Sequence, residues 1–181
     1  MKPIRFSIRT LLFATTSLAL IIAGLLWLTK DYRERRQAEE RLRSTGAVYA
    51  YVNEDRVATV VFNQPITTKD LGKVKSIERV ELQGFAVDDS TLSRLCELEK
   101  VDSLMVQSCT LDHVEALSRL ERIPKLKWLL FWNTPISDEA VEALSKLQQL
   151  EGLSFKNTNL TPAGLSKLQE AMPGVKIDSR P

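Results

Sequence analysis

Apolar residues recur along most of this chain about every 24 residues, and this repetition restricts the fold more than any other feature. In each unit, apolar residues stand at a first position, three residues later and five residues later. The triplets are Ile77, Val80 and Leu82; Val101, Leu104 and Val106; Leu126, Leu129 and Phe131; and Leu150, Leu153 and Phe155. A shorter unit precedes them: Val57, Val60 and Phe62. Such units bury apolar surface by stacking on their neighbours, so we predict a repeat protein.

The spacing inside each unit predicts one strand, one turn and one helix. The last two residues of each triplet stand two positions apart, as on one side of a strand. A further apolar residue follows, and after it comes a residue type that often caps helices: Thr67, Asp88, Asp112, Ser137 and Thr161. Apolar residues at helical spacing come next, such as Leu92 and Leu95. Strands that are joined through helices must lie parallel, so the expected fold class is α/β.

The pattern L-x-x-L-x-L-x-x-[NCT]-x-[IL] resembles that of the leucine-rich-repeat family over about residues 57–177. Its variable position falls on Cys109, Thr134 and Thr158, whereas Pro65 and Phe85 depart from it. The resemblance implies a short solenoid with a parallel sheet on its concave side and helices on its convex side. The family generally uses the concave side to bind proteins, and the resemblance implies no catalytic residues.

Residues 46–181 form the expected repeat domain, with a cap at each end. The segment 47–62 reads as a strand, a turn and a strand, which we expect to cover the first repeat. Val175 and Ile177 are expected to form a closing strand at 175–177. Caps are expected because an uncovered terminal repeat would expose its apolar core.

A second feature, at the other end of the chain, predicts a membrane anchor. Residues 10–29 carry no charge and follow a basic segment, 1–9. A helix of that length spans about 30 Å, the thickness of the hydrocarbon core of a bilayer. The start, residues 5–12, also resembles the anchors of bacterial membrane proteins that carry such repeats. A cleaved signal peptide is the alternative, but the end of the apolar run lacks a small-x-small cleavage pattern.

The orientation of this single-pass anchor follows less directly from the charges. Three Lys/Arg residues precede it and six follow within residues 30–45, which by count favours a cytoplasmic repeat domain. A short basic start before an apolar run instead resembles an export signal that stays as an anchor. We favour this second interpretation, which places the repeats outside the cytoplasm of a bacterial cell. Residues 30–45 are predicted to form a charged helical stalk rather than a coiled coil, because apolar heptads are not sustained.

The composition offers little chemistry for catalysis or for cofactors. His113 is the single histidine, and we interpret it as a surface residue. A nucleophilic Cys–His pair would need Cys96 or Cys109 to lie beside His113. No metal-binding, nucleophile-elbow or phosphate-binding motif occurs. Residues 46–181 hold sixteen Lys/Arg and nineteen Asp/Glu, so this region is mildly acidic and no nucleic-acid partner is expected. We therefore predict a protein without enzymatic activity, cofactor or metal.

The fourth repeat offers the candidate site. Residues between the apolar anchors should point out of the core, and in this repeat they are Trp128, Leu130 and Trp132. Exposed tryptophan pairs are uncommon on a soluble surface and tryptophan is enriched in binding hot spots. We predict a partner-binding surface of these residues and Met105, with Arg79, Glu81, Gln107 and Lys156 as a polar rim. The alternative is that the indoles fold over Gly152 and Ser154 and only protect the sheet.

The sequence thus predicts a membrane-anchored, non-enzymatic protein-binding module. The alternative is a structural component of the cell envelope that associates with itself through the same tryptophan patch. A peptide, a glycan and another membrane protein remain equally open as ligands.

Overall fold

The computed structural model describes residues 46–53, 56–67 and 77–180, together with residues 30, 32, 33, 36, 37, 40 and 42–44. The chain divides into two compact units, 1–38 and 39–181. The predicted basic segment 1–9 and membrane helix 10–29 lie outside the described residues. The described residues of the predicted stalk are helical. Within the described part of the chain, no helix has both the length and the apolar character needed to cross a bilayer.

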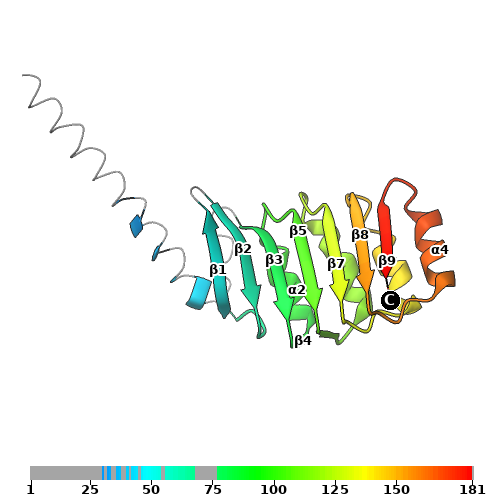
Figure 1. Ribbon diagram of the computed structural model, residues 1–181, viewed down its shortest axis with the longest axis horizontal. Helices are drawn as coiled ribbons and strands as arrows, with labels where there is room; N and C mark the ends of the chain where they lie inside the picture. The colour runs from blue at the N-terminus through cyan, green and yellow to red at the C-terminus, as the bar shows by residue number, and fades with distance from the viewer. Residues whose placement is uncertain are drawn as a thin grey trace, which may run out of the picture. The chain divides into compact units, whose positions relative to one another are not determined.

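The second unit is built on a seven-stranded sheet (Figure 1). In spatial order its strands are β1 (Ala47–Asn53), β2 (Arg56–Phe62), β3 (Ile77–Gln83), β5 (Ser103–Gln107), β7 (Trp128–Trp132), β8 (Gly152–Lys156) and β9 (Lys176–Arg180). β1 and β2 pair antiparallel, and every later pair is parallel. The parallel sheet that the sequence predicted is therefore confirmed.

The strands pair in the register of the sequence repeat. Leu104 pairs with Val80 on one side and with Leu129 on the other, and Leu129 pairs with Leu153. All four side chains are buried, as are the neighbouring apolar anchors Leu82, Val106, Phe131 and Phe155. The rings of Phe131 and Phe155 stack with their centroids 5.8 Å apart. The 24-residue repeat therefore corresponds to a continuous core beneath the sheet, and residues 56–67 and 77–180 have a leucine-rich-repeat-like architecture.

The return segments lie on one side of the sheet and are only partly α-helical. They comprise α2 (Asp89–Leu95), η2 (Val114–Arg122), η3 (Asp138–Ala140), α3 (Val141–Leu144) and α4 (Pro162–Ala171). η2 and η3 are 3-10 helices, which rise about 2.0 Å per residue and so cross the repeat with fewer residues. A second sheet of two short strands, β4 (Ala86–Val87) and β6 (Thr110–Leu111), links the first repeats.

The helix caps agree with the expectation in two repeats and differ in two. Asp88 accepts from the amide of Thr91, and Thr161 accepts from the amide of Gly164. The hydrogen bond from Thr91 lowers the pKa of Asp88. Asp112 and Ser137 were predicted as caps as well. The prediction is wrong for Asp112, because the N-cap of η2 is His113; Ser137 does occupy the N-cap position of η3, but its side chain makes no cap hydrogen bond.

The chain leaves four of the parallel strands through a left-handed residue. Gly84, Ser108, Asn133 and Asn157 follow β3, β5, β7 and β8, and all have φ between 50° and 76°. Each donates its amide to the carbonyl that ends the next strand, as Asn133 does to Lys156 at 2.9 Å. The buried Thr134 follows Asn133; its hydroxyl accepts the amide of Cys109 and donates to the carbonyl of Val106, both in the preceding repeat. These turns hold all strand ends in one line.

The last strand is longer than predicted and shifted along the chain. β9 spans Lys176–Arg180 rather than 175–177, and Ile177 pairs with Leu153. Only Ile177 keeps the apolar character of its unit, because Gly174 and Ser179 occupy the other two anchor positions. The closing strand is therefore a sixth repeat strand that adds three outward residues to the sheet.

Candidate functional site

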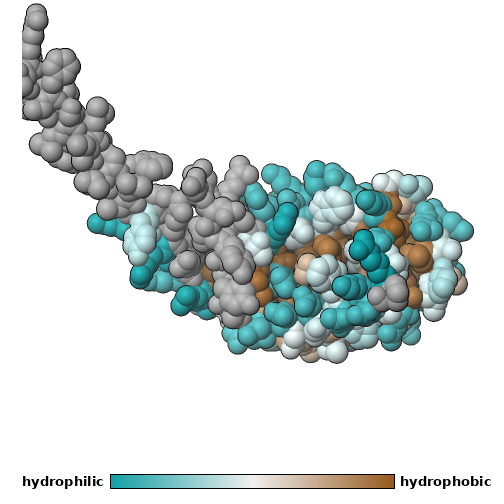
Figure 2. Space-filling model, viewed as in Figure 1, coloured by the Kyte–Doolittle hydropathy of each residue, from teal (hydrophilic) through white to brown (hydrophobic). Residues whose placement is uncertain are grey.

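One side of the seven-stranded sheet carries none of the described helices, and we call it the open face. It corresponds to the concave side of the predicted solenoid. Register places its outward residues in three rows across the strands. The first row is Thr59, Arg79, Ser103, Trp128, Gly152 and Lys176; the second is Val61, Glu81, Met105, Leu130, Ser154 and Asp178; the third is Gln83, Gln107, Trp132, Lys156 and Arg180. Figure 2 shows hydrophobic residues along the middle of this face, between hydrophilic ones.

All eight residues of the predicted partner-binding surface lie on the open face, on β3, β5, β7 and β8. Arg79, Trp128 and Lys156 are exposed, and Glu81, Met105, Gln107, Leu130 and Trp132 are half-buried. Five of them line one groove, whereas Gln107, Trp132 and Lys156 lie in the third row outside it. That they bind a partner stays a prediction. Two further outward positions, Val61 and Gly152, are buried.

Trp128 lies flat over the neighbouring strand because its neighbour there is a glycine. Gly152 pairs with Trp128 in register. A Cβ atom on Gly152 would stand 2.2 Å from Cζ3 of the indole, so no other residue type fits beneath the ring as it lies. Trp128 as a whole residue nevertheless stays 44% exposed. Trp128 therefore covers part of β8, as the alternative interpretation expected, and remains accessible; that it binds a partner stays a prediction.

Trp132, four residues further along β7, has a lysine as its neighbour on β8. Lys156 pairs with Trp132 in register, and its Nζ lies 5.5 Å from the centroid of the indole. At this distance the ammonium group and the ring attract each other. Trp132 is half-buried, and Lys156 is exposed. The third row thus holds an indole with a cation already beside it.

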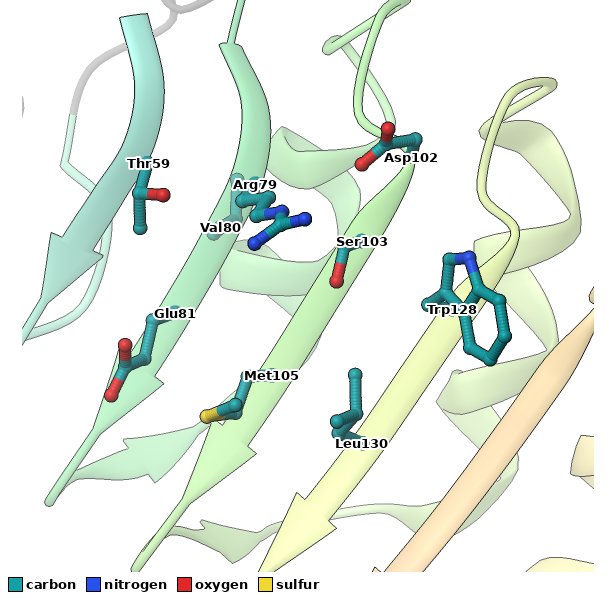
Figure 3. Close-up of a pocket in the computed structure, with 9 residues that line it drawn as sticks. All are labelled: Thr59, Arg79, Val80, Glu81, Asp102, Ser103, Met105, Trp128 and Leu130. Carbon is teal, nitrogen blue, oxygen red and sulfur yellow. The ribbon is translucent and has the colours of Figure 1, made fainter. Parts of the chain in front are cut away.

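A groove opens on the other side of Trp128, over β5. Its volume is about 410 Å³, and it is lined by Thr59, Arg79, Val80, Glu81, Asp102, Ser103, Met105, Trp128 and Leu130. β5 contributes the small Ser103 and the flexible Met105, and the β7 residues Trp128 and Leu130 form one wall. Figure 3 shows the Arg79 side chain extending from β3 toward Ser103, with the Trp128 indole turned toward β8. The groove has room for one or two side chains of a partner.

The groove carries charge on β3, across β5 from Trp128, and at the residue just before β5. Arg79 makes no ion pair with a described residue, and Glu81 stands two residues further along β3. Asp102, just before β5, was not among the predicted site residues. Its carbonyl accepts the amides of Lys127 and Trp128 at 2.8 and 2.9 Å, and its Oδ1 is buried without a hydrogen bond. Asp102 follows the anchor Val101 directly, so the sequence repeat could have placed it at the start of β5, at the edge of the sheet.

The sequence prediction also missed the outward residues of β9. Lys176, Asp178 and Arg180 pair with Gly152, Ser154 and Lys156. Arg180 Nη2 lies 3.0 Å from Asp178 Oδ2. Counting 24 residues on from β8 would have found all three. The open face therefore extends one strand further than predicted and ends in charged residues.

At the amino-terminal edge of the face, an ion pair joins β7 to β8. Lys127 Nζ lies 2.6 Å from Glu151 Oε1, and both side chains are about half exposed. The hydrogen bond to Glu151 raises the pKa of Lys127. This pair neutralises its own charges, so it contributes little to the electrostatic field of the open face.

Neither described cysteine nor His113 lines the groove. Cys109 is buried, and burial raises the pKa of its thiol, which disfavours the reactive thiolate. Cys96 is a second free thiol, and it donates to the carbonyl of Arg119 at 3.2 Å. His113 Nδ1 lies 3.6 Å from Asp89 Oδ1. Within the described ranges, no group of His, Cys, Asp and Glu is arranged to hold a metal ion.

Comparisons with known proteins found solved structures of similar fold but no matching family. No family model matches the chain, and no curated protein matches it. The chain is similar to the crystal structure of an internalin (InlF) from Listeria monocytogenes, with 13% sequence identity and a TM-score of 0.35. The match covers 78% of this chain and 49% of the internalin chain, so this chain spans about half the length of that structure. The assignment of a leucine-rich-repeat-like architecture rests on the strand register.

Proposed function

We propose that this chain is a non-enzymatic protein-binding module, and that the open face of its sheet receives the partner. The observation that carries this proposal is Trp128. Among the described residues, the exposed large hydrophobic side chains are Tyr32 and Trp128, and Trp128 alone belongs to the repeat unit. It borders the groove and stands near the middle of the parallel strands. An aromatic anchor at the centre of a surface is typical of an interface hot spot.

The surroundings of Trp128 favour binding because its side chain would lose little conformational freedom when a partner binds. The contact of its six-membered ring with Gly152 fixes its direction before a partner arrives. Side chains that are ordered on binding each cost about 0.5–1.5 kcal/mol, so a fixed indole avoids part of that cost. Met105 and Leu130 add apolar surface beside it. The groove can thus take an apolar side chain of the partner against a surface that is already formed.

The membrane anchor is part of the same proposal. Residues 10–29, an uncharged run of twenty, would hold the repeat unit at a bacterial cell membrane, with the repeats outside the cytoplasm. A reporter that is active only in the cytoplasm, fused after residue 181, tests the orientation. Activity of that fusion would place the repeats inside and contradict this part of the proposal.

Self-association through the same face is the second candidate, and the charges oppose it. β3 and β9 each stand two strands from β7. In a face-to-face dimer with its two-fold axis along β7, Arg79 would face Lys176 and Glu81 would face Asp178. A two-fold axis across the strands would instead place Lys176 against Arg180. Like charges that face each other cost affinity, so a different protein is the better partner.

Site-specific cross-linking tests the proposed function. A photoreactive benzoylphenylalanine in place of Ser154, on the open face beside Leu130, should form a discrete adduct with a second protein in intact cells. The same group in place of Glu121, an exposed residue of η2, is the matched control. Adducts of equal yield at both positions, or adducts that contain only a second copy of this chain, would contradict the proposal.

A further inference from the structure

The β8–β9 end of the open face is basic, although the repeat region as a whole is acidic. Lys156, Lys176 and Arg180 point outward there, with Asp178 as the one carboxylate in the same rows of these two described strands. Residues 46–181 together hold sixteen Lys/Arg and nineteen Asp/Glu. The acidic residues of the region are therefore concentrated elsewhere, and this end of the face differs in sign from its surroundings.

Two of these cations form a corner next to Trp132. Lys156 and Arg180 are register partners on adjacent strands, about 4.8 Å apart along the sheet. Lys156 makes no ion pair with a described residue, and its ammonium group lies beside the Trp132 ring. The amide of Asn157 donates to the carbonyl of Arg180, which ties the ends of the two strands together. The backbone thus presents both cations side by side.

The ion pair of Arg180 does not remove this charge. Arg180 and Asp178 have side chains that are 74% and 43% exposed. Ion pairs at such exposure are weak and are readily exchanged, so an incoming carboxylate can displace Asp178 at little cost. A carboxylate between Lys156 and Arg180 would gain two charge-assisted hydrogen bonds.

The rest of the open face determines what kind of anion fits. The groove beyond Trp128 is apolar in its middle; it carries the carboxylate of Glu81 and the cation of Arg79 on β3, and the carboxylate of Asp102 just before β5. A long uniform polyanion, such as a nucleic acid or an anionic lipid surface, would meet those carboxylates. A polypeptide can place acidic residues at one end and an apolar residue at the other.

We infer that the partner of the open face presents a short acidic polypeptide segment to Lys156 and Arg180, next to an apolar side chain in the groove. This inference rests on the proposed function and names the chemistry of the partner. The groove lies over β5 in the first two rows, and the cationic corner lies on β8 and β9 in the third row. Two to three strand spacings, about 10–14 Å, and about 7–10 Å along the strands separate them, which gives roughly 15 Å in all. An extended segment covers that distance with roughly four or five residues, since each adds about 3.3 Å.

Selection from a displayed library of short random peptides on the purified full-length chain tests the inference. Selected peptides should combine an aromatic or aliphatic residue with Asp or Glu about four or five positions away. They should lose at least about tenfold in affinity on the double variant Lys156→Gln, Arg180→Gln. The matched control is Lys125→Gln, Arg122→Gln, which neutralises two exposed cations off the open face and should leave affinity unchanged.

The outcomes separate the inference from the proposed function. Peptides that are apolar but not acidic, or that bind the double variant as well as the parent chain, would overturn the inference alone. Peptides that bind a Trp128→Ser variant unchanged would overturn the proposed function. Selection of no peptide counts against both. Inorganic polyphosphate that competes as well as the peptides, with no dependence on Trp128, would identify a general anion site and also overturn the inference.

Discussion

Trp128 and Trp132 stand four residues apart on the same strand and face the same side, yet their surroundings differ. Trp128 lies over Gly152, stays 44% exposed and borders the groove. Trp132 is half-buried, and the ammonium group of Lys156 stands near its ring. The strand and the residue type are the same in both cases. The difference therefore comes from the register partner on β8, a glycine for one indole and a lysine for the other.

This difference assigns separate roles to the two indoles. The glycine leaves space for a ring to lie down and keep one face free, which suits a partner's apolar side chain. Lys156 already lies beside the Trp132 ring. This arrangement suits a site in which the ring holds the ammonium group in position for an anion of the partner. β7 and β8 therefore place the proposed apolar anchor, Trp128, and one of the two corner cations, Lys156, on the same face, and the two halves of the comparison can be tested separately.

Replacing Trp128 should have the largest effect on binding. Loss of a central aromatic anchor costs about 2 kcal/mol or more, so Trp128→Ser should weaken binding of the selected peptides roughly 30-fold. The stability of the fold should change little, because the ring covers one strand and fills no core position. Fluorescence anisotropy measures the affinity, and urea unfolding measures the stability. Val114→Ser, on η2, is the control that should leave the affinity unchanged.

Filling the space under the ring should have the next largest effect. In Gly152→Ala the new methyl group would stand about where the Trp128 ring lies, so the ring must swing away from β8. We expect acrylamide to quench Trp128 more strongly, in a background with Trp27→Phe and Trp132→Phe, and peptide affinity to fall about tenfold, which is about 1.4 kcal/mol.

The matched control for that change is another glycine. A Cβ added at Gly174 meets no atom within 4 Å, so Gly174→Ala adds a methyl group without displacing an aromatic ring. Equal quenching and equal affinity in the two alanine variants would show that Gly152 does not hold Trp128 in place.

Replacing Trp132 should weaken binding less than replacing Trp128. Trp132→Ser removes the ring beside Lys156 but leaves the groove, the Gly152 contact and both corner cations. We expect a loss of a few-fold in peptide affinity, because Lys156 would sample more positions when it is no longer near the indole. The same anisotropy titration checks this. A loss as large as that of Trp128→Ser would reverse the roles assigned to the two indoles.

Much of this comparison could be predicted from the sequence, because the repeat offset determines register. Counting 24 residues from Trp128 and Trp132 reaches Gly152 and Lys156, so the sequence alone identifies both neighbours. The direction of the Trp128 ring does not follow from this count, because it depends on the rotamer that the empty space at Gly152 permits. The sequence left both interpretations open; the ring lies over Gly152, and partner binding stays a prediction.

Other features were missed for reasons of the same kind. The 3-10 form of η2 was missed because apolar residues at positions 117 and 120 suit an α-helix equally well. The full length of β9 was missed because Ile177 is its only apolar anchor. The prediction relied on apolar residues, whereas the strand continues in register without them. The groove was missed because it depends on the small side chain of Ser103 lying between longer neighbouring side chains. No single residue type in the sequence indicates that arrangement.

The contact between Lys156 and Trp132 should have the smallest effect, and it is measured as stability. A cation over an exposed indole contributes about 0.5–1 kcal/mol, so Lys156→Gln should lower the free energy of unfolding by about that amount. Lys156→Arg keeps the cation and should recover most of the loss, whereas Lys125→Gln, an exposed lysine off the sheet, should change nothing. Urea unfolding of the three variants decides the point. If Lys156→Gln and Lys125→Gln unfold alike, the ammonium group is not held at the ring, and the cationic corner then has to be explained by Arg180 and the strand register alone.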